Sequence, residues 1–254
     1  MPLNKNHEIN IECSEKQFTD IYLPFLSVNT VLFSYHNERL NVLLLRFGST
    51  DYFMLPGGFI KKNLDVDQAA FRSLKERTGL ENIFLEQFYV AGKASRSSDK
   101  ILQKELQNLG YQVSDDWLNQ RKVSVCYYAL VNENKIKPVT TERFISEHKW
   151  IDVREVPKLM FDHNSIIKKA VSRLQADMGK KIISHNLLNE PFTMPELRKL
   201  YEVVYQKQFI RSNFQRKMLG LGVLKRIGKK YEGKANKAPY LYRFKKSKNE
   251  TSLE

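Results

Sequence analysis

The sequence lacks the features that direct a chain into a membrane or an oxidising compartment. It has no run of about 18 apolar residues, and its first residues, MPLNKNHEINIECSEKQ, contain no apolar core of a signal peptide. Only two cysteines are present, Cys13 and Cys126, which excludes a disulfide framework. We therefore expect a cytoplasmic protein with no membrane partner.

Acidic residues are scarce near the C-terminus. The chain of 254 residues has 42 Lys and Arg against 28 Asp and Glu, a net charge of +14. Residues 181–254 hold 17 of the basic residues but only 6 of the acidic ones, so most of the excess charge lies there. A basic segment with its own hydrophobic periodicity indicates a folded domain with an anionic partner rather than a solvated tail.

The first 180 residues show strand and helix patterns in turn. Apolar residues at helical spacing predict a helix over 164–179 that ends at Gly179. We predict an α+β domain over residues 21–180, after an N-terminal extension of residues 1–20 and with a partly helical insertion over 98–119. Runs rich in β-branched and aromatic residues predict its strands over 25–35, 41–48, 82–92, 122–131 and 148–157.

A strand, a glycine turn and a helix are predicted over residues 55–80, LPGGFIKKNLDVDQAAFRSLKERTGL. Leu55-Pro56-Gly57-Gly58 forms a tight bend, and apolar residues then recur at helical spacing until Gly79 stops them. Residues three and four apart share one face of a helix. One such face, which points back toward the glycine turn, carries Ser73, Glu76 and Arg77.

This stretch resembles the Nudix box, the loop and helix of the Nudix hydrolases. In that family four glutamates hold magnesium against the diphosphate of the substrate, because a hard divalent cation needs oxygen ligands. This chain has Leu64, Ser73 and Arg77 where three of those glutamates belong and keeps only Glu76. The positions that match the pattern in register, without a gap, are Gly58, Arg72, Leu74, Glu76, Gly79 and Leu80.

The changed positions argue against hydrolysis. An arginine about 5 Å from a divalent ion is repelled by roughly 6 kcal/mol at an effective dielectric constant near 20. We therefore expect a Nudix fold without catalytic residues, metal or cofactor. The alternative is a Nudix hydrolase of nucleoside diphosphate derivatives with an atypical metal site, in which Glu142 or Glu147 assists Glu76.

Two helices are predicted after residue 192. Thr193 and Glu196 form a capping box that opens the first, which carries an apolar stripe. In the second, IRSNFQRKMLGLG, Ser212 and Gln215 could form another capping box. Phe214, Met218 and Leu221 are expected to face a core, while the opposite face carries Asn213, Arg216 and Lys217. These polar side chains suit base edges and phosphates in a major groove, although a solvated face has the same composition.

The residues that follow, 223–246, predict two short strands around a lysine-rich turn. Two helices and a basic hairpin in this order predict a C-terminal winged helix-turn-helix over residues 185–247. A basic hairpin without a ligand, or a scaffold that binds RNA or protein, remains the alternative. The predicted DNA-binding residues are Arg211, Asn213, Arg216, Lys217, Lys225, Arg226, Lys229, Lys230, Lys234, Lys237 and Arg243.

The order of the degenerate Nudix box, FTMPELRKLYEVVY, NFQRKMLGLGVLKR and APYLYRF is similar to that of the Nudix-related transcriptional regulators of the NrtR and AraR types. The resemblance covers nearly the whole chain apart from its first 20 or so residues and the insertion. It implies a homodimer whose Nudix domains sense a metabolite and whose winged helices bind a palindromic operator in double-stranded DNA. The effector that it implies is ADP-ribose, a pentose or a related sugar.

The position of the effector pocket follows from where Nudix proteins hold their substrates. Three arginines in the expected lining suit a phosphate, whereas a free sugar would favour carboxylates and amides, so both ligand classes stay open. A helix-capping role for Asp162 or Asn164 is an alternative to ligand binding. The residues expected to line the pocket are Arg46, Phe53, Gly57, Gly58, Arg96, Arg121, Asp162 and His163.

Overall fold

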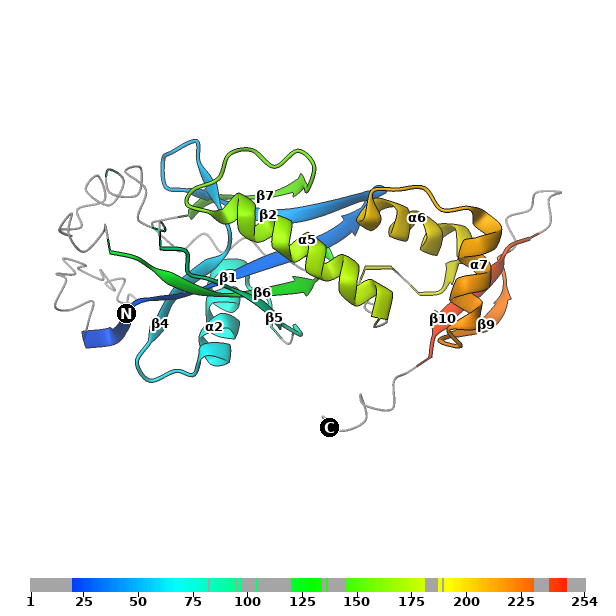
Figure 1. The fold of residues 1–254 in the computed structure, drawn as a ribbon, viewed down its shortest axis with the longest axis horizontal. Helices are drawn as coiled ribbons and strands as arrows, with labels where there is room; N and C mark the ends of the chain where they lie inside the picture. Colours follow the sequence, from blue (N-terminus) through cyan, green and yellow to red (C-terminus); the bar gives the residue numbers. More distant parts are fainter. Residues whose placement is uncertain are drawn as a thin grey trace, which may run out of the picture.

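The computed structural model describes residues 20–81, 83–94, 96, 104, 120–133, 136, 145–180, 187–188, 190–230 and 238–245. In these ranges a mixed sheet of seven strands lies between two helices, and a smaller unit of two helices and a three-stranded sheet follows (Figure 1). The predicted α+β architecture is confirmed. The predicted insertion, apart from residue 104, and residues 1–19 of the predicted extension lie outside the described residues.

The long strand β1 lies at the centre of the larger sheet. It pairs antiparallel with β2 and β4 and parallel with β6, which makes the sheet mixed. Strands β3 and β7 both pair with β2, and β5 pairs with β6. The strands are β1 (Tyr22–His36), β2 (Arg39–Phe47), β3 (Phe53–Met54), β4 (Gly57–Lys61), β5 (Glu86–Ala91), β6 (Val123–Leu130) and β7 (Ile145–Asp152).

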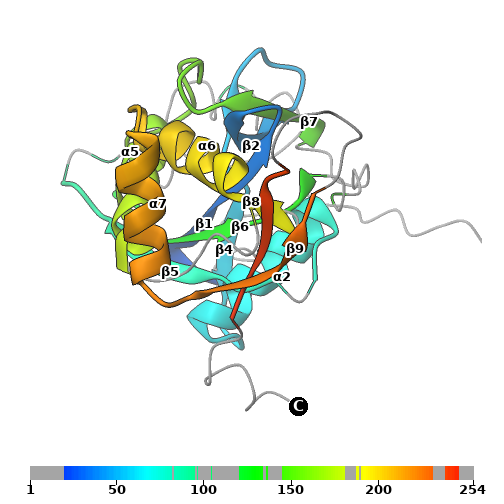
Figure 2. The ribbon, with the colours of Figure 1, turned by 90° about the vertical axis from the view of Figure 1, so that its right-hand side faces the viewer.

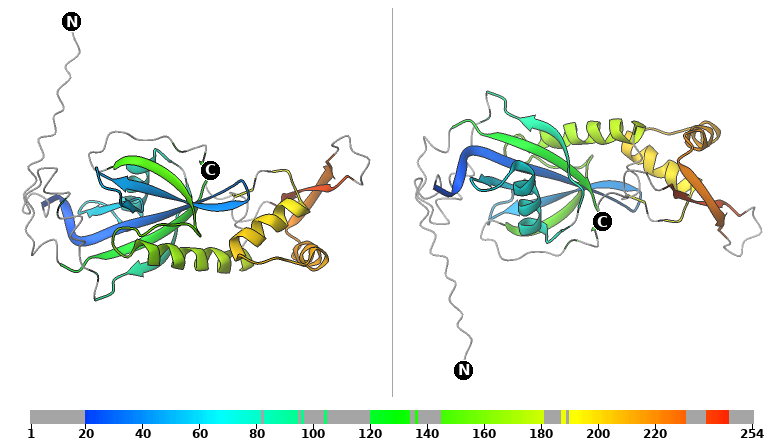
Figure 3. Two further views of the ribbon diagram at one scale, coloured as in Figure 1. Left: turned by 90° about the horizontal axis from the view of Figure 1, so that it is seen from above. Right: turned by 90° about the horizontal axis from the view of Figure 1, so that it is seen from below.

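Helices α2 (Val66–Thr78) and α5 (His163–Lys180) cover opposite faces of this sheet (Figure 1, Figure 3). Successive side chains of a strand point to opposite faces, and β2 is buried on both. Val42 and Leu44 pack in the cluster that contains α5, whereas Leu43 and Leu45 pack in the cluster that contains Leu74 of α2. The apolar run of β2 thus follows from its position between two helices.

The smaller unit is a winged helix. Its sheet has the order β8-β10-β9 and includes a short strand, β8, that the sequence did not indicate. The capping box predicted at Thr193 is confirmed, because its backbone N–H donates to Glu196 Oε2 at 2.6 Å and its hydroxyl accepts from the Glu196 N–H at 3.4 Å. The elements are β8 (Phe192–Thr193), α6 (Met194–Tyr205), α7 (Arg211–Gly220), β9 (Leu224–Lys229) and β10 (Tyr240–Phe244).

Two details predicted for α7 are wrong. The helix begins at Arg211 with Ile210 at its N-cap, so Ser212 lies inside the first turn and makes no capping box. The Phe214 ring packs against the Tyr201 ring, with centroids 5.3 Å apart, and this contact sets which face of the helix is buried. The backbone N–H of Phe214 donates to Ile210 O at 2.9 Å, so the first helical hydrogen bond begins at Ile210. Leu221 is 50% exposed rather than in the core, because the chain leaves the helix there.

The winged helix packs directly against the C-terminal half of α5 (Figure 3). Gln175 Nε2 donates to Val204 O at 2.8 Å, and the Tyr205 hydroxyl donates to Gln175 O at 2.6 Å. The Tyr201 hydroxyl adds a bond to Met178 O at 3.2 Å. One hydrophobic cluster continues from the large sheet through α5 into α6 and α7. The two units therefore share a core.

Candidate functional site

The outer face of α7 is polar and exposed. Arg211, Asn213, Arg216 and Lys217 are all exposed, whereas Phe214 and Met218 are buried. Arg216 Nη2 donates to Asn213 Oδ1 at 3.0 Å, which holds the two side chains together on this face. Figure 2 shows α7 and the β9–β10 hairpin side by side at the end of the molecule that faces the viewer.

The hairpin presents like charges in register. Lys225, Arg226 and Lys229 of β9 are exposed, and Lys225 lies directly opposite Arg243 of β10. Like charges directly opposite on paired strands are destabilising. Arg243 has a distant carboxylate partner, Glu190 Oε2 at 4.0 Å. The remaining positive potential would be relieved by a polyanion, so the arrangement favours a nucleic-acid partner.

Tyr240 is a part of this surface that the sequence analysis missed. Its ring lies 3.9 Å from the Arg226 guanidinium carbon and 5.6 Å from Lys229 Nζ. A stacked guanidinium is held in place while its N–H groups stay available. The register shifts between Leu241 and Tyr242, and this irregularity decides which β9 residues meet Tyr240. Only a sequence signal for that irregularity could have identified the contact.

Lys230 differs from Lys225, because its side chain lies beside a carboxylate of α6. Lys230 Nζ lies 3.4 Å from Glu196 Oε1, and its N–H donates to Pro239 O at 2.9 Å. This lysine therefore joins the hairpin to the start of α6. Lys234 and Lys237 lie outside the described residues.

The segment Leu55–Gly58, for which the name glycine turn is kept, lies against β1 and α2, but the predicted tight bend is wrong at Gly57 and Gly58, which begin strand β4. Gly57 is paired with Asn29 of β1. A Cβ atom at Gly57 would lie 2.5 Å from both Asn29 Oδ1 and Val28 O, so no larger residue fits. A Cβ atom at Gly58 would lie 3.4 Å from Ser73 Oγ. The helix face that carries Ser73 thus reaches the glycine turn, as predicted.

Substitution of the two glycines should have unequal effects on stability. Gly57→Ala is expected to lower the free energy of unfolding by about 3 kcal/mol or more, because its methyl group meets a backbone carbonyl that cannot move aside. Gly58→Ala should lower it by less than about 1 kcal/mol, since the Ser73 side chain can adjust. Urea unfolding followed by tryptophan fluorescence measures both. Equal midpoints for the two variants would contradict this account of the turn.

Arg96 and Asp162, both expected to line the effector pocket, form an ion pair with each other in a partly buried structural contact. The Arg96 side chain is 8% exposed, and its Nε donates to Asp162 Oδ1 at 2.9 Å. Its Nη1 donates to Lys122 O at 3.0 Å and to Ser124 Oγ at 2.8 Å. The helix-capping alternative is wrong for Asn164, whose Oδ1 accepts from the Leu159 N–H in the preceding loop. The Asp162–Arg96 pair instead fixes the start of α5 against β6.

His163 connects α5 to the glycine turn. The side chain is buried, and its Nδ1 accepts a hydrogen bond from the Leu55 N–H at 3.0 Å. Burial, with a smaller contribution from Arg96, lowers the pKa of His163 to about 3. The imidazole is therefore neutral at pH 7, and Nδ1 carries no proton. Its role in the described structure is to hold the turn rather than to face an open pocket.

Arg46 and Phe53 also lie together, as paired residues of β2 and β3. The Arg46 guanidinium lies 5.4 Å from the centre of the Phe53 ring, and its Nε lies 3.0 Å from Glu147 Oε2. Glu147, proposed above as an additional metal ligand, is thus paired with an arginine. Arg121 is exposed just before β6, and in the described ranges no contact joins it to the other predicted effector residues.

The residues at the Nudix-box positions do not fit a magnesium site. Glu76 lies at the surface and accepts a hydrogen bond from Arg72 Nε at 2.6 Å. Ser73 is buried beside Gly58, and Arg77 supplies a cation where the family has a carboxylate. Among the described residues no group of three or more His, Cys, Asp and Glu could hold a metal ion. Glu142 lies outside them.

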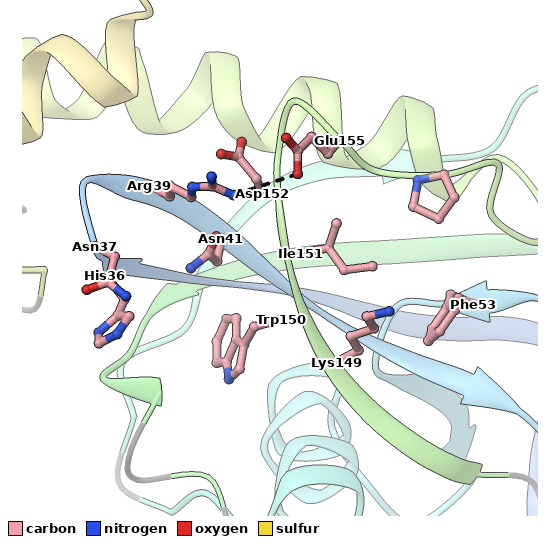
Figure 4. A pocket seen from close by; sticks show the side chains of 11 residues that line it. His36, Asn37, Arg39, Asn41, Phe53, Lys149, Trp150, Ile151, Asp152 and Glu155 are labelled. Atoms are coloured by element: carbon pink, nitrogen blue, oxygen red, sulfur yellow. Dashed lines mark ion pairs between the residues drawn. The ribbon is translucent and has the colours of Figure 1, made fainter.

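An open hollow of about 750 Å³ lies near the β1–β2 turn and the end of β7 (Figure 4). Of the predicted effector residues only Phe53 lines it. Its charged groups pair locally, Arg39 with Glu155 at 3.8 Å and Asp152 with Arg154 at 2.5 Å. The hollow is distinct from the glycine turn, and its lining does not define a ligand class.

Both domains match known family models. Residues 24–174 match the NUDIX domain, and residues 184–244 match the NrtR DNA-binding winged helix domain. Fold and exposed basic face thus define a Nudix protein with a DNA-binding winged helix. The chain belongs to the Nudix-related transcriptional regulators of the NrtR type.

Individual relatives agree with this assignment. The chain is 28% identical over 242 residues, 91% of its length and 86% of the relative's, to the ADPR responsive transcriptional repressor NtrR of Acinetobacter baylyi. It is 28% identical to Shewanella oneidensis NrtR in a crystal structure with a 27mer DNA, with a TM-score of 0.65 over 87% of this chain and 94% of the other. A MutT/nudix family protein from Enterococcus faecalis shares the fold, with 22% identity and a TM-score of 0.64 over 88% and 87% of the two chains. No helix in the described ranges is long and apolar enough to cross a membrane.

Proposed function

We propose that this protein regulates transcription as a homodimer: its winged helices bind a two-fold operator, and its Nudix domain senses an ADP-ribose-type metabolite without hydrolysing it. The observation that carries the proposal is the common basic surface of α7 and the β9–β10 hairpin. In this surface Lys225 opposes Arg243, and Arg226 is held by Tyr240. We place the division between the effector and DNA-binding domains at residues 180–185.

The proposed mode of DNA binding places α7 in the major groove. Arg216 and Asn213, already joined by a hydrogen bond, present the fork and amide that suit guanine and adenine edges. The wing cations then contact the phosphate backbone. The Shewanella relative, which was crystallised with a 27mer DNA, is similar to 87% of this chain, and this supports DNA as the partner.

An ADP-ribose-type effector is favoured over a free sugar by the Acinetobacter relative, which is an ADPR responsive repressor and aligns with 91% of this chain. Sensing is favoured over hydrolysis by the pairing of the carboxylates near the Nudix helix. Glu76 pairs with Arg72 and Glu147 with Arg46, and Ser73 and Arg77 stand where the family has two further glutamates, so no group of carboxylates gathers there among the described residues.

The proposal can be tested with purified protein and a library of random DNA duplexes. Selection should yield a two-fold symmetric sequence whose half-sites lie about 10 base pairs, or a multiple of that, apart. ADP-ribose should change affinity for the selected operator by about 5- to 150-fold, the usual size of an allosteric coupling. Metal-dependent breakdown of ADP-ribose that disappears in Glu76→Ala would instead establish the hydrolase alternative. Binding of ADP-ribose without any effect on DNA affinity would remove the sensing role.

A further inference from the structure

The β9–β10 hairpin gathers two cations around one exposed aromatic ring. The Tyr240 residue is 40% exposed, and its ring centre lies 3.9 Å from the Arg226 guanidinium carbon and 5.6 Å from Lys229 Nζ. We propose that Tyr240, Arg226 and Lys229 form a phosphate clasp, in which the ring positions both cations on a single phosphate of the DNA backbone. The inference rests on the proposed DNA-binding function and assigns Tyr240 as a positioning residue within it.

A β-bulge in β9 brings the two cations together. Arg226 and Lys229 are three residues apart, and side chains three apart on a regular strand point to opposite faces. The register between β9 and β10 shifts here, because Ile227 has no partner in β10. An extra residue of this kind bends the strand and re-aims its side chains. Both cations therefore reach the Tyr240 ring, which a regular strand would not allow.

Arg226 and Lys229 have no carboxylate partner within the ranges that the structure describes. Carboxylates of these ranges that reach the hairpin pair with other cations. Glu190 Oε2 lies 4.0 Å from Arg243, and Glu196 Oε1 lies 3.4 Å from Lys230. A tyrosine ring attracts a cation without neutralising its charge. The two cations beside the ring therefore repel each other, and an anion bound between them would relieve this repulsion.

The thickness of the ring and guanidinium together favours a phosphate over a base edge. The guanidinium carbon lies 3.9 Å from the ring centre. With the van der Waals radii of the outer surfaces, the pair is roughly 7 to 8 Å thick. The minor groove of B-DNA is only about 6 Å wide, so the pair cannot enter it as a unit. A phosphate at the edge of the groove is accessible from outside, and the guanidinium fork can donate two parallel hydrogen bonds to it. The Lys229 ammonium adds a point charge to the same phosphate.

Fluorescence anisotropy with the operator duplex and a random duplex tests the role of the ring. Tyr240→Leu should weaken binding to both duplexes by about 5- to 30-fold, because the attraction between ring and cation is lost in both wings of the dimer. Its salt slope should stay that of the wild type, since both cations remain. Tyr240→Phe keeps the ring and should bind like the wild type. Tyr52→Leu is the matched control, because Tyr52 is 36% exposed in the turn before β3, and it should change neither quantity.

The salt slope also tests whether the two cations share one phosphate. Arg226→Gln should weaken binding by more than about 10-fold, because a charge-assisted bidentate contact is lost. The double variant Arg226→Gln, Lys229→Gln should reduce the slope by about 0.9 per protomer, the value for one phosphate. In the Arg226→Gln background, Tyr240→Leu should have a smaller effect than in the wild type. Circular dichroism melts check that every variant is folded at the titration temperature.

Different outcomes would overturn the clasp and the proposed function. Wild-type affinity in Tyr240→Leu would show that the ring positions nothing. An equal effect of Tyr240→Leu with and without Arg226 would show that the ring acts through the hairpin fold. A double variant that loses two phosphate contacts per protomer would show that the cations bind separate phosphates. Each of these results leaves the DNA-binding function in place, whereas a wild-type protein that binds neither duplex would remove both the function and the clasp.

Discussion

Affinity for the operator duplex is expected to fall by about 10³- to 10⁵-fold when the salt concentration rises from 50 to 200 mM. This range corresponds to roughly 6 to 10 phosphate contacts, each of which releases a counterion from DNA. Exposed cations on α7 and the hairpin supply such contacts, and a dimer doubles them. Fluorescence anisotropy titrations of a labelled duplex at four salt concentrations measure the slope. An affinity that does not depend on salt would remove the DNA-binding assignment.

Single substitutions should distinguish the residues of this surface that contact phosphates from those that contact base edges. Lys225→Ala should weaken binding to operator and random DNA alike and reduce the salt slope by about one contact. Arg216→Ala should cost about 1 to 3 kcal/mol mainly on the operator, because it removes a base-reading fork and the partner of Asn213. Lys62→Ala, an exposed cation in the turn before α2, is the control and should change neither. Equal losses on both duplexes for Arg216→Ala would show that α7 does not read sequence.

The sequence was sufficient to predict the elements but not all of their limits. The long apolar strands of β1, β2 and β6 and the capping box at Thr193 are local patterns, and each formed where it was expected. The bend predicted at Gly57 and Gly58 is instead the start of strand β4, and the strand predicted over 148–157 ends at Asp152. The start of α7 was not predictable, because Ser212 looks like a capping residue while packing of Phe214 against Tyr201 sets the actual phase. Strand β8, of two residues, exists only through its pairing with β10.

Long-range contacts give two of the predicted site residues partners that the sequence alone does not reveal. Arg96 lies in a polar stretch that suggests an exposed cation, yet it is buried through Asp162, 66 residues later, and through Ser124 of β6. Lys230 resembles the other wing lysines but lies beside Glu196, 34 residues earlier. The face of α7, by contrast, depends on helical periodicity alone and was read correctly as exposed. Its contact with DNA stays a prediction.

Helix α5 gives the proposed effector and DNA sites a shared structural element. Its first residue, His163, accepts the Leu55 N–H of the glycine turn, and its last turns hold α6 through Gln175 and Met178. With 18 residues it spans about 27 Å. Linkage between two sites requires an element whose arrangement both ligands affect. A ligand that displaces the glycine turn would act on α5, and through it on the winged helix.

Because the His163 imidazole at the start of α5 is buried, we expect the free energy of unfolding to fall strongly as the pH is lowered. His163 has a pKa lowered from 6.5 to about 3, with burial as the largest cause. As the pH falls, the unfolded chain takes up this proton first, so the contribution of His163 to stability is complete above about pH 6.5 and is lost progressively toward pH 3. The slope approaches about 1.4 kcal/mol per pH unit. Between pH 7 and pH 5 the loss should therefore be about 2 kcal/mol.

The variant His163→Asn isolates this contribution. The asparagine Oδ1 can accept the Leu55 N–H in place of Nδ1 but does not titrate, so the variant should lose about 2 kcal/mol less than the wild type between pH 7 and pH 5. Carboxylates that also lose stabilising contacts in acid are common to both proteins and cancel in the comparison. His36→Asn is the control, because His36 is a half-exposed histidine beside Glu133 and should leave most of the acid slope unchanged. Urea unfolding at pH 7, 6 and 5 measures all three proteins. Identical pH slopes for the wild type and His163→Asn would show that His163 is not held neutral in the folded protein, and the connection between the glycine turn and α5 would then need another basis.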